Sequence, residues 1–423
     1  MNKSFIKIKL KDVCESIFSG GTPDTRKPEY WGGKHYWLSS GETRNRFISS
    51  TEKTITQRGI DNSSTRLAKK GDVLIASAGQ GKTRGQTSFV LVDTYINQSI
   101  ISLRANRKYL DSLFLFYLIS GKYNSLRNMS DANAIRGSLT CKMFESMELL
   151  IPEDIKIQKQ ISSLLYNYDS LIENNSSRIQ ILESIVKIVY DEWFIKFKFP
   201  GNENVKIVDS EFGKIPEGWK IKTLSEICDL ISRGVTPKYK KGTKKYIINQ
   251  KVNQGCLLDY KDLKELDDDM TIPEEKIAVK GDVLVNSLGE GTIGRTHYYN
   301  NNNIFAVDQH MSICRSDKLQ NTLYIYFFLS SKLGQDWITS VKTGGTNMTM
   351  LNISTLRQCK ILYPKDEILL NFYEIVKPLM NLKAKLDEKN QNLIVTRNLL
   401  LPKLIYGEIN ANKIDIKISE VST

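Results

Sequence analysis

Residues 153–199, EDIKIQKQISSLLYNYDSLIENNSSRIQILESIVKIVYDEWFIKFKF, are the stretch that decides the fold. Apolar side chains recur in it at steps of three and four, which is the period of one helix face. That face consists of Leu165, Tyr168, Ile172, Asn175, Ile179, Leu182, Val186, Val189 and Trp193. Pro152 and Asp154 mark its start, and Pro200-Gly201 its end. Because about 40 helical residues span roughly 60 Å, the stretch predicts a rod that cannot lie inside one small domain.

A second stretch of this kind lies near the end of the chain. Pro364-Lys365-Asp366 opens it, and Pro402 and Gly407 close it. Its apolar residues at helical spacing are Ile368, Phe372, Ile375, Leu379, Leu382, Leu386, Leu393 and Leu400. Each rod follows a globular segment. We therefore predict a globule at 1–152, a helical spacer at 153–199, a globule at 200–364, a helical spacer at 365–410 and a tail at 411–423.

The single polar member of the first rod's apolar face, Asn175, has two readings. A buried asparagine fixes the register of paired helices at some cost in stability. Alternatively, Asn175 faces solvent at a slight bend beside Asn174 and Ser176-Ser177.

The composition favours a polyanionic partner. The chain has 423 residues with 60 Lys and Arg against 47 Asp and Glu, a net charge of +13, and the pI is about 9.2. A lysine-rich solvated surface would give the same balance. No apolar run approaches the roughly 18 residues of a membrane span, and the N-terminus does not resemble a signal peptide, so we expect a cytoplasmic protein. The six cysteines are scattered, which favours free thiols over a structural zinc.

The two globules repeat each other. Lys70-Gly71-Asp72-Val73-Leu74 matches Lys280-Gly281-Asp282-Val283-Leu284, and Gly21-Thr22-Pro23 matches Val235-Thr236-Pro237. Asn97-Gln98 matches Asp308-Gln309. The offset stays between 210 residues, from Asp72 to Asp282, and 214 residues, from Leu10 to Leu224. We therefore interpret the chain as a tandem duplication.

Each globule has a mixed pattern. Residues 73–77 and 283–287 are short apolar runs after Gly-Asp, which predicts strands, whereas 110–120 and 323–331 predict short buried helices. The fold class is therefore α+β: two homologous α/β domains, each followed by a long α-helix. Antiparallel pairing of the two helices as a coiled coil would cover their apolar faces and give pseudo-two-fold symmetry. Such a protein suits two DNA half-sites.

Several motifs resemble the specificity subunit of type I restriction–modification systems. They are Gly20-Gly21-Thr22-Pro23, Pro28-Glu29-Tyr30-Trp31-Gly32-Gly33, Trp37-Leu38-Ser39-Ser40-Gly41, Glu192-Trp193-Phe194-Ile195-Lys196-Phe197, Ile215-Pro216-Glu217-Gly218-Trp219, and the ending from Leu400 to Ile409. The resemblance spans essentially the whole chain. In the second globule, Lys238 to Tyr246 replaces the Pro-Glu-Tyr-Trp-Gly-Gly stretch, so the two domains should read different half-sites.

The resemblance implies two target-recognition domains that read a bipartite, asymmetric sequence in double-stranded DNA. It implies that the helices space the domains and dock two methyltransferase subunits, and that a motor-nuclease subunit joins the complex. The chain itself would then be non-catalytic and bind no cofactor. S-adenosylmethionine, ATP and Mg²⁺ would be used by the partner subunits.

We expect DNA contacts from basic and polar loops of both globules. The candidates are Arg26, Lys27, Arg44, Arg46, Lys82, Arg84, Arg136, Lys238, Lys240, Lys241, Lys244, Lys245, Arg295, Thr343 and Asn347. The alternatives are an ordinary solvated turn for Lys82, Arg84 and Arg295, a solvated and partly disordered loop for residues 238–246, and packing turns for residues 131–136 and 343–347. Asn249, Gln250, Asn253 and Gln254 are weaker candidates for reading adenine.

Other chemistries find little support in the sequence. Residues 76–83, ASAGQGKT, approximate a phosphate-binding loop, but Ala76 stands where the motif needs glycine. His35, His297 and His310 are isolated, and we expect neither a catalytic residue nor a metal site. Two alternative functions remain: a two-domain DNA-binding regulator, and a protein-interaction scaffold without a methyltransferase partner.

Overall fold

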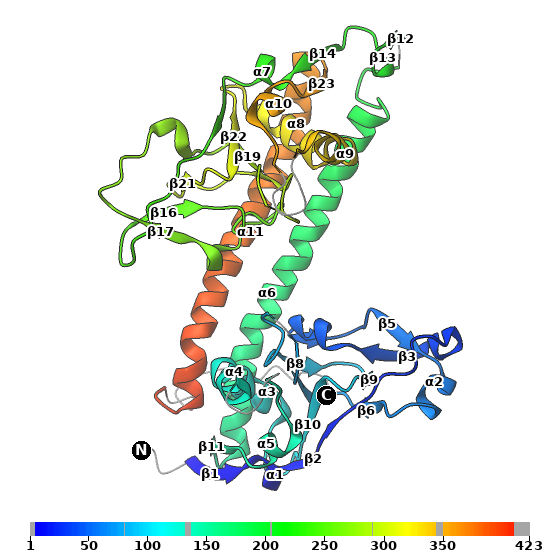
Figure 1. Cartoon of the computed structure of the whole chain (residues 1–423), viewed down its shortest axis with the longest axis vertical. Coiled ribbons are helices and arrows are strands. Elements are labelled where there is room, and N and C mark those ends of the chain that lie inside the picture. Colours follow the sequence, from blue (N-terminus) through cyan, green and yellow to red (C-terminus); the bar gives the residue numbers. More distant parts are fainter. Residues whose placement is uncertain are drawn as a thin grey trace. The chain divides into compact units, whose positions relative to one another are not determined.

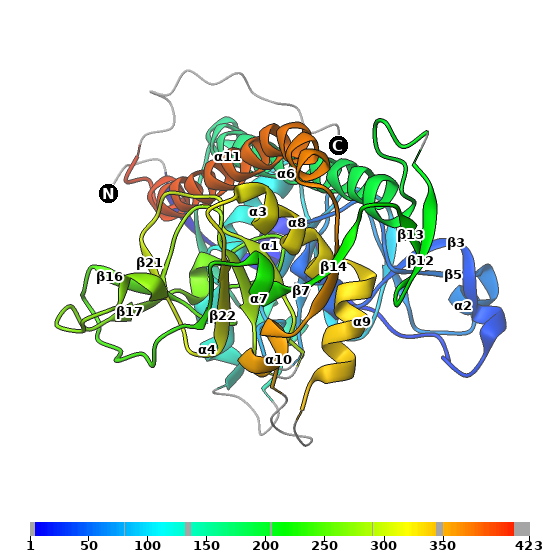
Figure 2. The same cartoon turned by 90° about the horizontal axis from the view of Figure 1, so that it is seen from above.

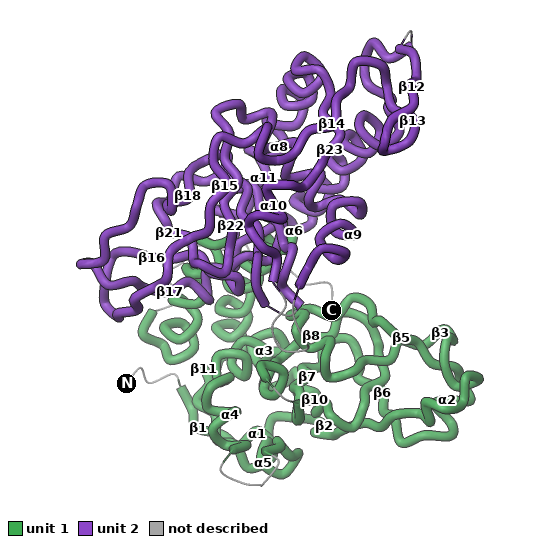
Figure 3. The backbone as a smooth tube through the Cα atoms, turned by 45° about the horizontal axis from the view of Figure 1, so that its top comes forward, with its two compact units in different colours: residues 1–173, 391–423 green, residues 174–390 purple. Residues whose placement is uncertain are grey.

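The structure is a computed structural model that describes residues 5–79, 81–131, 137–203, 205–289, 291–343 and 350–409. It divides into two compact units (Figure 3). Unit 1 comprises residues 1–173 and 391–423, and unit 2 comprises residues 174–390. Each unit therefore contains one globule together with half of each long helix.

In the described residues of unit 1, three sheets build the globule (Figure 1). The largest has the order β2-β10-β7-β8-β4, with β2 (Cys14–Ser19), β10 (Ile100–Ala105), β7 (Val73–Ala76), β8 (Thr87–Val90) and β4 (Phe47–Ile48). The second has the order β5-β3-β9-β6, with β5 (Lys53–Ile55), β3 (Trp31–Leu38), β9 (Thr94–Ile96) and β6 (Arg66–Ala68). β1 (Phe5–Lys9) and β11 (Glu148–Pro152) form a separate antiparallel pair.

Unit 2 repeats this arrangement. Its sheet β15-β22-β19-β20 consists of β15 (Leu230–Arg233), β22 (Met311–Arg315), β19 (Val283–Asn286) and β20 (Thr296–Tyr298). Its sheet β17-β16-β21-β18 consists of β17 (Lys264–Leu266), β16 (Lys245–Ile248), β21 (Phe305–Val307) and β18 (Ile277–Ala278). β14 (Lys220–Thr223) pairs with β23 (Lys360–Tyr363), and β12 (Ile207–Ser210) forms a hairpin with β13 (Gly213–Pro216). The second sheet keeps one parallel pair in both units, β3 with β9 and β16 with β21, so the duplication and the α+β class are confirmed.

The short helices of unit 1 are α1 (Leu10–Val13), α2 (Gln57–Asp61), α3 (Ser112–Ser120), α4 (Tyr123–Asp131) and α5 (Cys141–Glu145), with 3₁₀ turns at Pro28–Tyr30 and Ser40–Arg44. Those of unit 2 are α7 (Leu224–Ile227), α8 (Leu319–Ser330), α9 (Lys332–Val341) and α10 (Ile353–Arg357), with 3₁₀ turns at Tyr260–Asp262 and Glu274–Lys276. In unit 2, α8 lies between the β15-β22-β19-β20 sheet and the long helices (Figures 1 and 2). Its Tyr324 ring lies 4.8 Å from Phe194, which in turn lies 4.9 Å from Phe372. No helix in the described part of the chain is long and apolar enough to cross a membrane.

The same buried ion pair stabilises both globules. In unit 1, Asp72 accepts hydrogen bonds of 2.9 and 2.7 Å from Arg104. In unit 2, Asp282 accepts two of 2.8 Å from Arg315. Both carboxylates are the aspartate of the repeated Lys-Gly-Asp motif, and both are almost fully buried. That motif therefore marks a structural element of the fold.

The long helices are α6 (Ile155–Tyr190), which ends in a π-helical turn (Asp191–Ile195), and α11 (Asp366–Ile405). They lie side by side within each unit (Figures 1 and 2). All nine residues of the apolar face predicted for α6 are buried or half-buried. The face predicted for α11 is partly wrong, because Ile375 and Leu382 are 47% and 38% exposed. The buried face of α11 instead includes Leu369, Val376, Met380, Lys383, Asn390 and Arg397.

Polar layers explain this error. Lys383, Asn390 and Arg397 are buried at seven-residue steps along α11. In unit 2, Lys383 pairs with Glu183 at 2.6 Å, and Asn390 donates to Ser176 at 3.2 Å. In unit 1, Arg397 pairs with Asp169. The α6 residues of these contacts have increasing numbers, 169, 176 and 183, while their α11 partners have decreasing numbers, 397, 390 and 383. The two helices are therefore antiparallel, as predicted.

Asn175 belongs to the middle layer. Its Nδ2 donates to Asn390 Oδ1 at 2.9 Å, and both side chains are 5% exposed. The first of its two readings, a buried asparagine in the helix interface, is therefore confirmed. In this register the two buried amides form a hydrogen bond with each other, whereas an apolar neighbour would leave each amide without a hydrogen-bond partner. The pair therefore favours this register of the two helices over other registers.

Candidate nucleic-acid interface

Most candidate loops leave one edge of the β2-β10-β7-β8-β4 sheet in unit 1 and of the β15-β22-β19-β20 sheet in unit 2. In unit 1, Ser19 pairs with Ile101 and Ala76 with Ile100, so the loops after β2, between β7 and β8, and before β10 meet at one edge. In unit 2, Arg233 pairs with Ser312 and Asn286 with Met311, so the corresponding loops meet at the equivalent edge. We call these two places the sheet edges. Loops placed on a rigid sheet are suited to binding.

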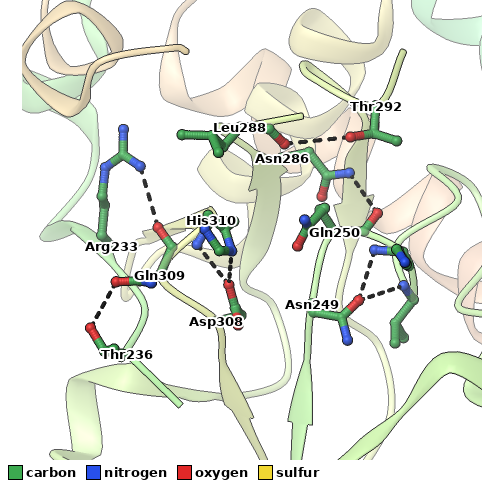
Figure 4. Close-up of polar contacts among 12 residues, drawn as sticks. Arg233, Thr236, Asn249, Gln250, Asn286, Leu288, Thr292, Asp308, Gln309 and His310 are labelled. Atoms are coloured by element: carbon green, nitrogen blue, oxygen red, sulfur yellow. Dashed lines mark hydrogen bonds and ion pairs between the residues drawn. The ribbon is translucent and has the colours of Figure 1, made fainter. Parts of the chain in front are cut away.

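The same side-chain pair occupies both sheet edges. Thr22 Oγ1 donates to Gln98 Oε1 at 2.6 Å in unit 1, and Thr236 Oγ1 donates to Gln309 Oε1 at 2.7 Å in unit 2. Figure 4 shows the second pair. Because each threonine hydroxyl donates to the glutamine Oε1, the hydrogen bond fixes the glutamine side chain. The NH₂ group of the glutamine is left as a donor. These four residues served only as markers of the repeat in the sequence. Their recurrence in matched positions is the feature that could have identified them as site residues.

Two further residues shape the edge of unit 2 (Figure 4). Arg233 donates to the carbonyls of Gln309, at 3.3 Å, and Leu351, at 2.8 Å. Burial lowers the pKa of its guanidinium from the usual value. Asp308 Oδ1 lies 2.6 Å from His310 Nδ1 and accepts the His310 backbone N–H at 2.8 Å. The loop that carries Gln309 is therefore held from both sides.

The amides considered for adenine readout divide into two kinds. Asn249 and Asn253 are buried, and their side chains bond to neighbouring backbone groups. Asn253 also donates to Asn286 at 3.0 Å, so both asparagines stabilise the fold. Gln254 accepts from Arg295 at 2.7 Å at the surface, where Arg295 also donates to the Gly291 carbonyl at 3.2 Å. Gln250 contributes its carbonyl to Asn286.

The candidate side chains of unit 1 differ in where they point, and several of them lie at the surface. Arg26 is 87% exposed and paired with Asp24 at 2.9 Å, and Lys27 donates to Tyr30 at 3.2 Å. Lys82 is exposed on the β7–β8 loop, and Arg44 is exposed and paired with Glu52.

Two arginines of unit 1 point inward. Arg46 donates to Asp169 at 3.1 Å and lies 4.9 Å from the Phe116 ring centre. Arg84 pairs with Asp131 and donates to the Gly137 carbonyl at 2.8 Å, and its side chain is only 11% exposed. Both arginines therefore hold elements of the globule together. Arg136 lies outside the described residues.

The lysine-rich loop of unit 2 lies beside an acidic segment. Lys240 pairs with Asp267 at 3.1 Å, and Lys245 donates to the Asp268 and Met270 carbonyls. The exposed candidates Lys238, Lys241 and Lys244 have no side-chain ion pair within the described part of the chain. Thr343 is exposed and bridges to Met350, and Asn347 lies outside the described residues.

Residues 76–83, of which the structure describes all but residue 80, follow strand β7, which ends at Ala76. The next element is the strand β8, which begins at Thr87 and pairs antiparallel with β7. A phosphate-binding loop needs a helix N-terminus after its glycines. Here a strand follows, so the arrangement does not fit a nucleotide site. Among the described residues, no group of three His, Cys, Asp or Glu side chains could hold a metal ion.

Comparison with known proteins gives a consistent result. The family model of the type I restriction modification DNA specificity domain matches residues 2–184 and 216–395. The MjaIX specificity subunit of Methanocaldococcus jannaschii is 28% identical, over 96% of the chain and 94% of that protein. The HindI specificity subunit of Haemophilus influenzae is 22% identical, over 88% of the chain and 94% of that protein. The crystal structure of an S subunit from M. genitalium covers 96% of the chain with a TM-score of 0.60 and 15% identity, and it shares the fold.

Proposed function

The chain belongs to the type I restriction modification DNA specificity family, and from this premise we propose that it selects a bipartite, asymmetric target in double-stranded DNA. The observation that carries the proposal is the pair of equivalent sheet edges, each with a Thr–Gln pair and exposed basic residues. In this proposal basic side chains bind phosphates and position the protein, while glutamine amides and loop side chains read base edges. A specificity subunit is itself non-catalytic.

The partner subunits follow from the same proposal. α6 exposes a stripe in unit 2, Ile181, Ile185 and Ile188, which are 59%, 41% and 61% exposed. In unit 1, the α11 residues Val395 and Leu399 and the residue that follows the helix, Tyr406, form a second stripe and are 57%, 62% and 50% exposed. Contiguous exposed apolar side chains are typical of partner surfaces. We assign each stripe to one methyltransferase subunit, so that the complex contains two.

The chemistry belongs to those partners. A docked methyltransferase would flip an adenine in each half-site out of the duplex and methylate it from S-adenosylmethionine. A motor-nuclease subunit that uses ATP and Mg²⁺ would act on unmethylated targets. The specificity subunit positions the DNA, so that only an adenine in the selected sequence reaches the methyltransferase.

Exchange of one globule tests the proposed function. Replacing residues 1–150 with the matching globule of a relative should change one half-site, because each sheet edge reads its own half. The other half-site and the spacer should stay the same. Sequencing of methylated adenines in DNA exposed to the complete complex measures both. If the exchange alters both half-sites, or if the native complex methylates no defined sequence, the proposal is wrong. A DNA-binding regulator would bind its site without co-purifying with a methyltransferase.

A matched pair of lysine variants tests phosphate contact in the loop of unit 2. Lys241→Ala should lower the slope of log K against log salt by about one, as expected for one lost phosphate contact. Lys240→Ala should change the slope less, because Asp267 already neutralises that charge at 3.1 Å. Binding of duplex target to the complex at several salt concentrations gives both slopes. Equal slopes for the two variants would contradict phosphate contact by Lys241.

A further inference from the structure

Buried charges connect each globule to the helix pair. In unit 1 the connecting group is Asp169 on α6, whose side chain is 3% exposed. It pairs with Arg397 on α11, accepts from Arg46 at 3.1 Å and accepts from the Tyr117 hydroxyl at 2.7 Å. One carboxylate thus holds two helices and two positions of the globule. Burial, and then the carboxylate of Asp169, raise the pKa of Tyr117, so the phenol stays protonated and donates.

Unit 2 uses the opposite charge for the same purpose. Lys383 on α11 has a side chain 8% exposed and pairs with Glu183 on α6 at 2.6 Å. Its Nζ also donates to the carbonyl of Cys256, in the globule, at 2.7 Å. Burial opposes the charge on Lys383, but nearby Tyr326 and Glu183 more than offset it and raise its pKa. The ammonium therefore joins both helices to the globule.

These contacts restrict rotation in a way that apolar packing does not. Apolar burial is non-directional, so by itself it specifies the angle of a globule less sharply than a directional contact does. Charge-assisted hydrogen bonds are short and directional, and a buried charge that loses its partner is strongly disfavoured. A heptad slip of the helices would place Glu183 against Val376 or Asp169 against Leu404, depending on its direction. The charges thus oppose both slip and rocking.

We propose that Asp169 and Lys383 are positioning residues for DNA recognition, which fix the angle of each globule on the helix pair and so limit the spacer lengths that the protein accepts. The inference rests on the proposed function and adds to it. Neither residue touches DNA. Their contribution should be visible in the spacer and absent from the base sequence of either half-site.

A spacer library tests the proposal. The full chain, with its methyltransferase subunits, acts on DNA in which the native half-sites are separated by spacers of every length, and sequencing gives the methylated fraction for each. Lys383→Met and Asp169→Asn should each increase methylation at spacers one base pair longer or shorter than the preferred spacer. The ratio of the methylated fraction at such a spacer to that at the preferred spacer should rise roughly tenfold. The selected bases should not change. Lys383→Arg keeps a buried donor at this position, so this variant should retain the narrow spacer preference.

Lys385→Met is the matched control, because Lys385 is an exposed lysine on the same helix. Melting curves establish that each variant is folded, and Glu183→Gln provides a milder change in unit 2 if Lys383→Met does not fold. Folded variants that keep the native spacer preference would overturn the positioning role, and so would a loss of base preference. These results differ from failure of the proposed function, in which the unaltered complex would methylate no defined target.

Discussion

Inserting three heptads into both long helices is expected to lengthen the preferred spacer by about nine base pairs. The insertions belong between residues 173 and 174 of α6 and between 390 and 391 of α11, the boundaries of the two units. Each unit keeps all its own contacts there. Twenty-one helical residues add roughly 31 Å, and DNA rises about 3.4 Å per base pair.

Rotation makes this prediction specific. At about 100° per residue, twenty-one residues turn one unit by the equivalent of roughly 300°. Nine base pairs turn a half-site by about 310°, given 10–10.5 base pairs per turn. For a helix pair parallel to the DNA axis, the two rotations nearly coincide.

A single heptad in both helices is the matched control. One heptad would turn one unit by roughly −20°, whereas the matching change in spacer length would turn the half-site by about 105°. Because these two rotations differ, methylation of the target should fall steeply at every spacer. Methylation mapping with the spacer library measures both variants. An unchanged spacer in the three-heptad variant would show that the helices do not set the distance.

Removing the repeated core aspartate is expected to produce the largest loss of stability. Asp282→Ala leaves the Arg315 guanidinium, 24% exposed, without either of its charged hydrogen bonds, and Asp72→Ala does the same to Arg104. Breaking such a pair costs about 3 kcal/mol of unfolding free energy. Because the duplication gives both globules this pair, the two variants should lose similar amounts, each in its own unit.

Denaturant unfolding, followed separately for each unit by proteolysis, measures the loss. Lys332→Ala is the control, because its ion pair with Asp336 is solvent-exposed and is worth at most about 0.5 kcal/mol. A loss as small as that of the control would mean that apolar packing alone holds these sheets.

The sequence predicted the duplication and the first helix because both depend on apolar periodicity and ordered motifs. Val186 and Trp193, for example, lie on the buried face as their spacing requires. The second helix was harder. Lys383, Asn390 and Arg397 occupy buried positions, so apolar periodicity assigned Ile375 and Leu382 to that face although they are exposed. Periodicity cannot identify polar groups buried opposite complementary partners.

The candidate site was predictable by region but not by residue. Arg46 and Lys240 look equally suitable for DNA in the sequence. However, Arg46 binds the buried Asp169, and Lys240 is paired with Asp267, 27 residues later. Tertiary contacts of this kind decide which cations remain available. The Thr22–Gln98 and Thr236–Gln309 pairs join segments more than 70 residues apart, a distance over which local pattern carries no information.

Unit 2 is continuous in the chain, whereas unit 1 is assembled from two segments, residues 1–173 and 391–423, that flank it. During synthesis, residues 1–173 leave the ribosome first, yet Leu404 and Ile405 of their core cluster arrive only when α11 is complete. The carboxylate of Asp169 must wait for Arg397 over the same interval. Unit 2 can close as soon as residue 390 has emerged. The order of folding should therefore be unit 2 before unit 1, with the first globule exposing an unpaired helix until residues 391–405 have been made.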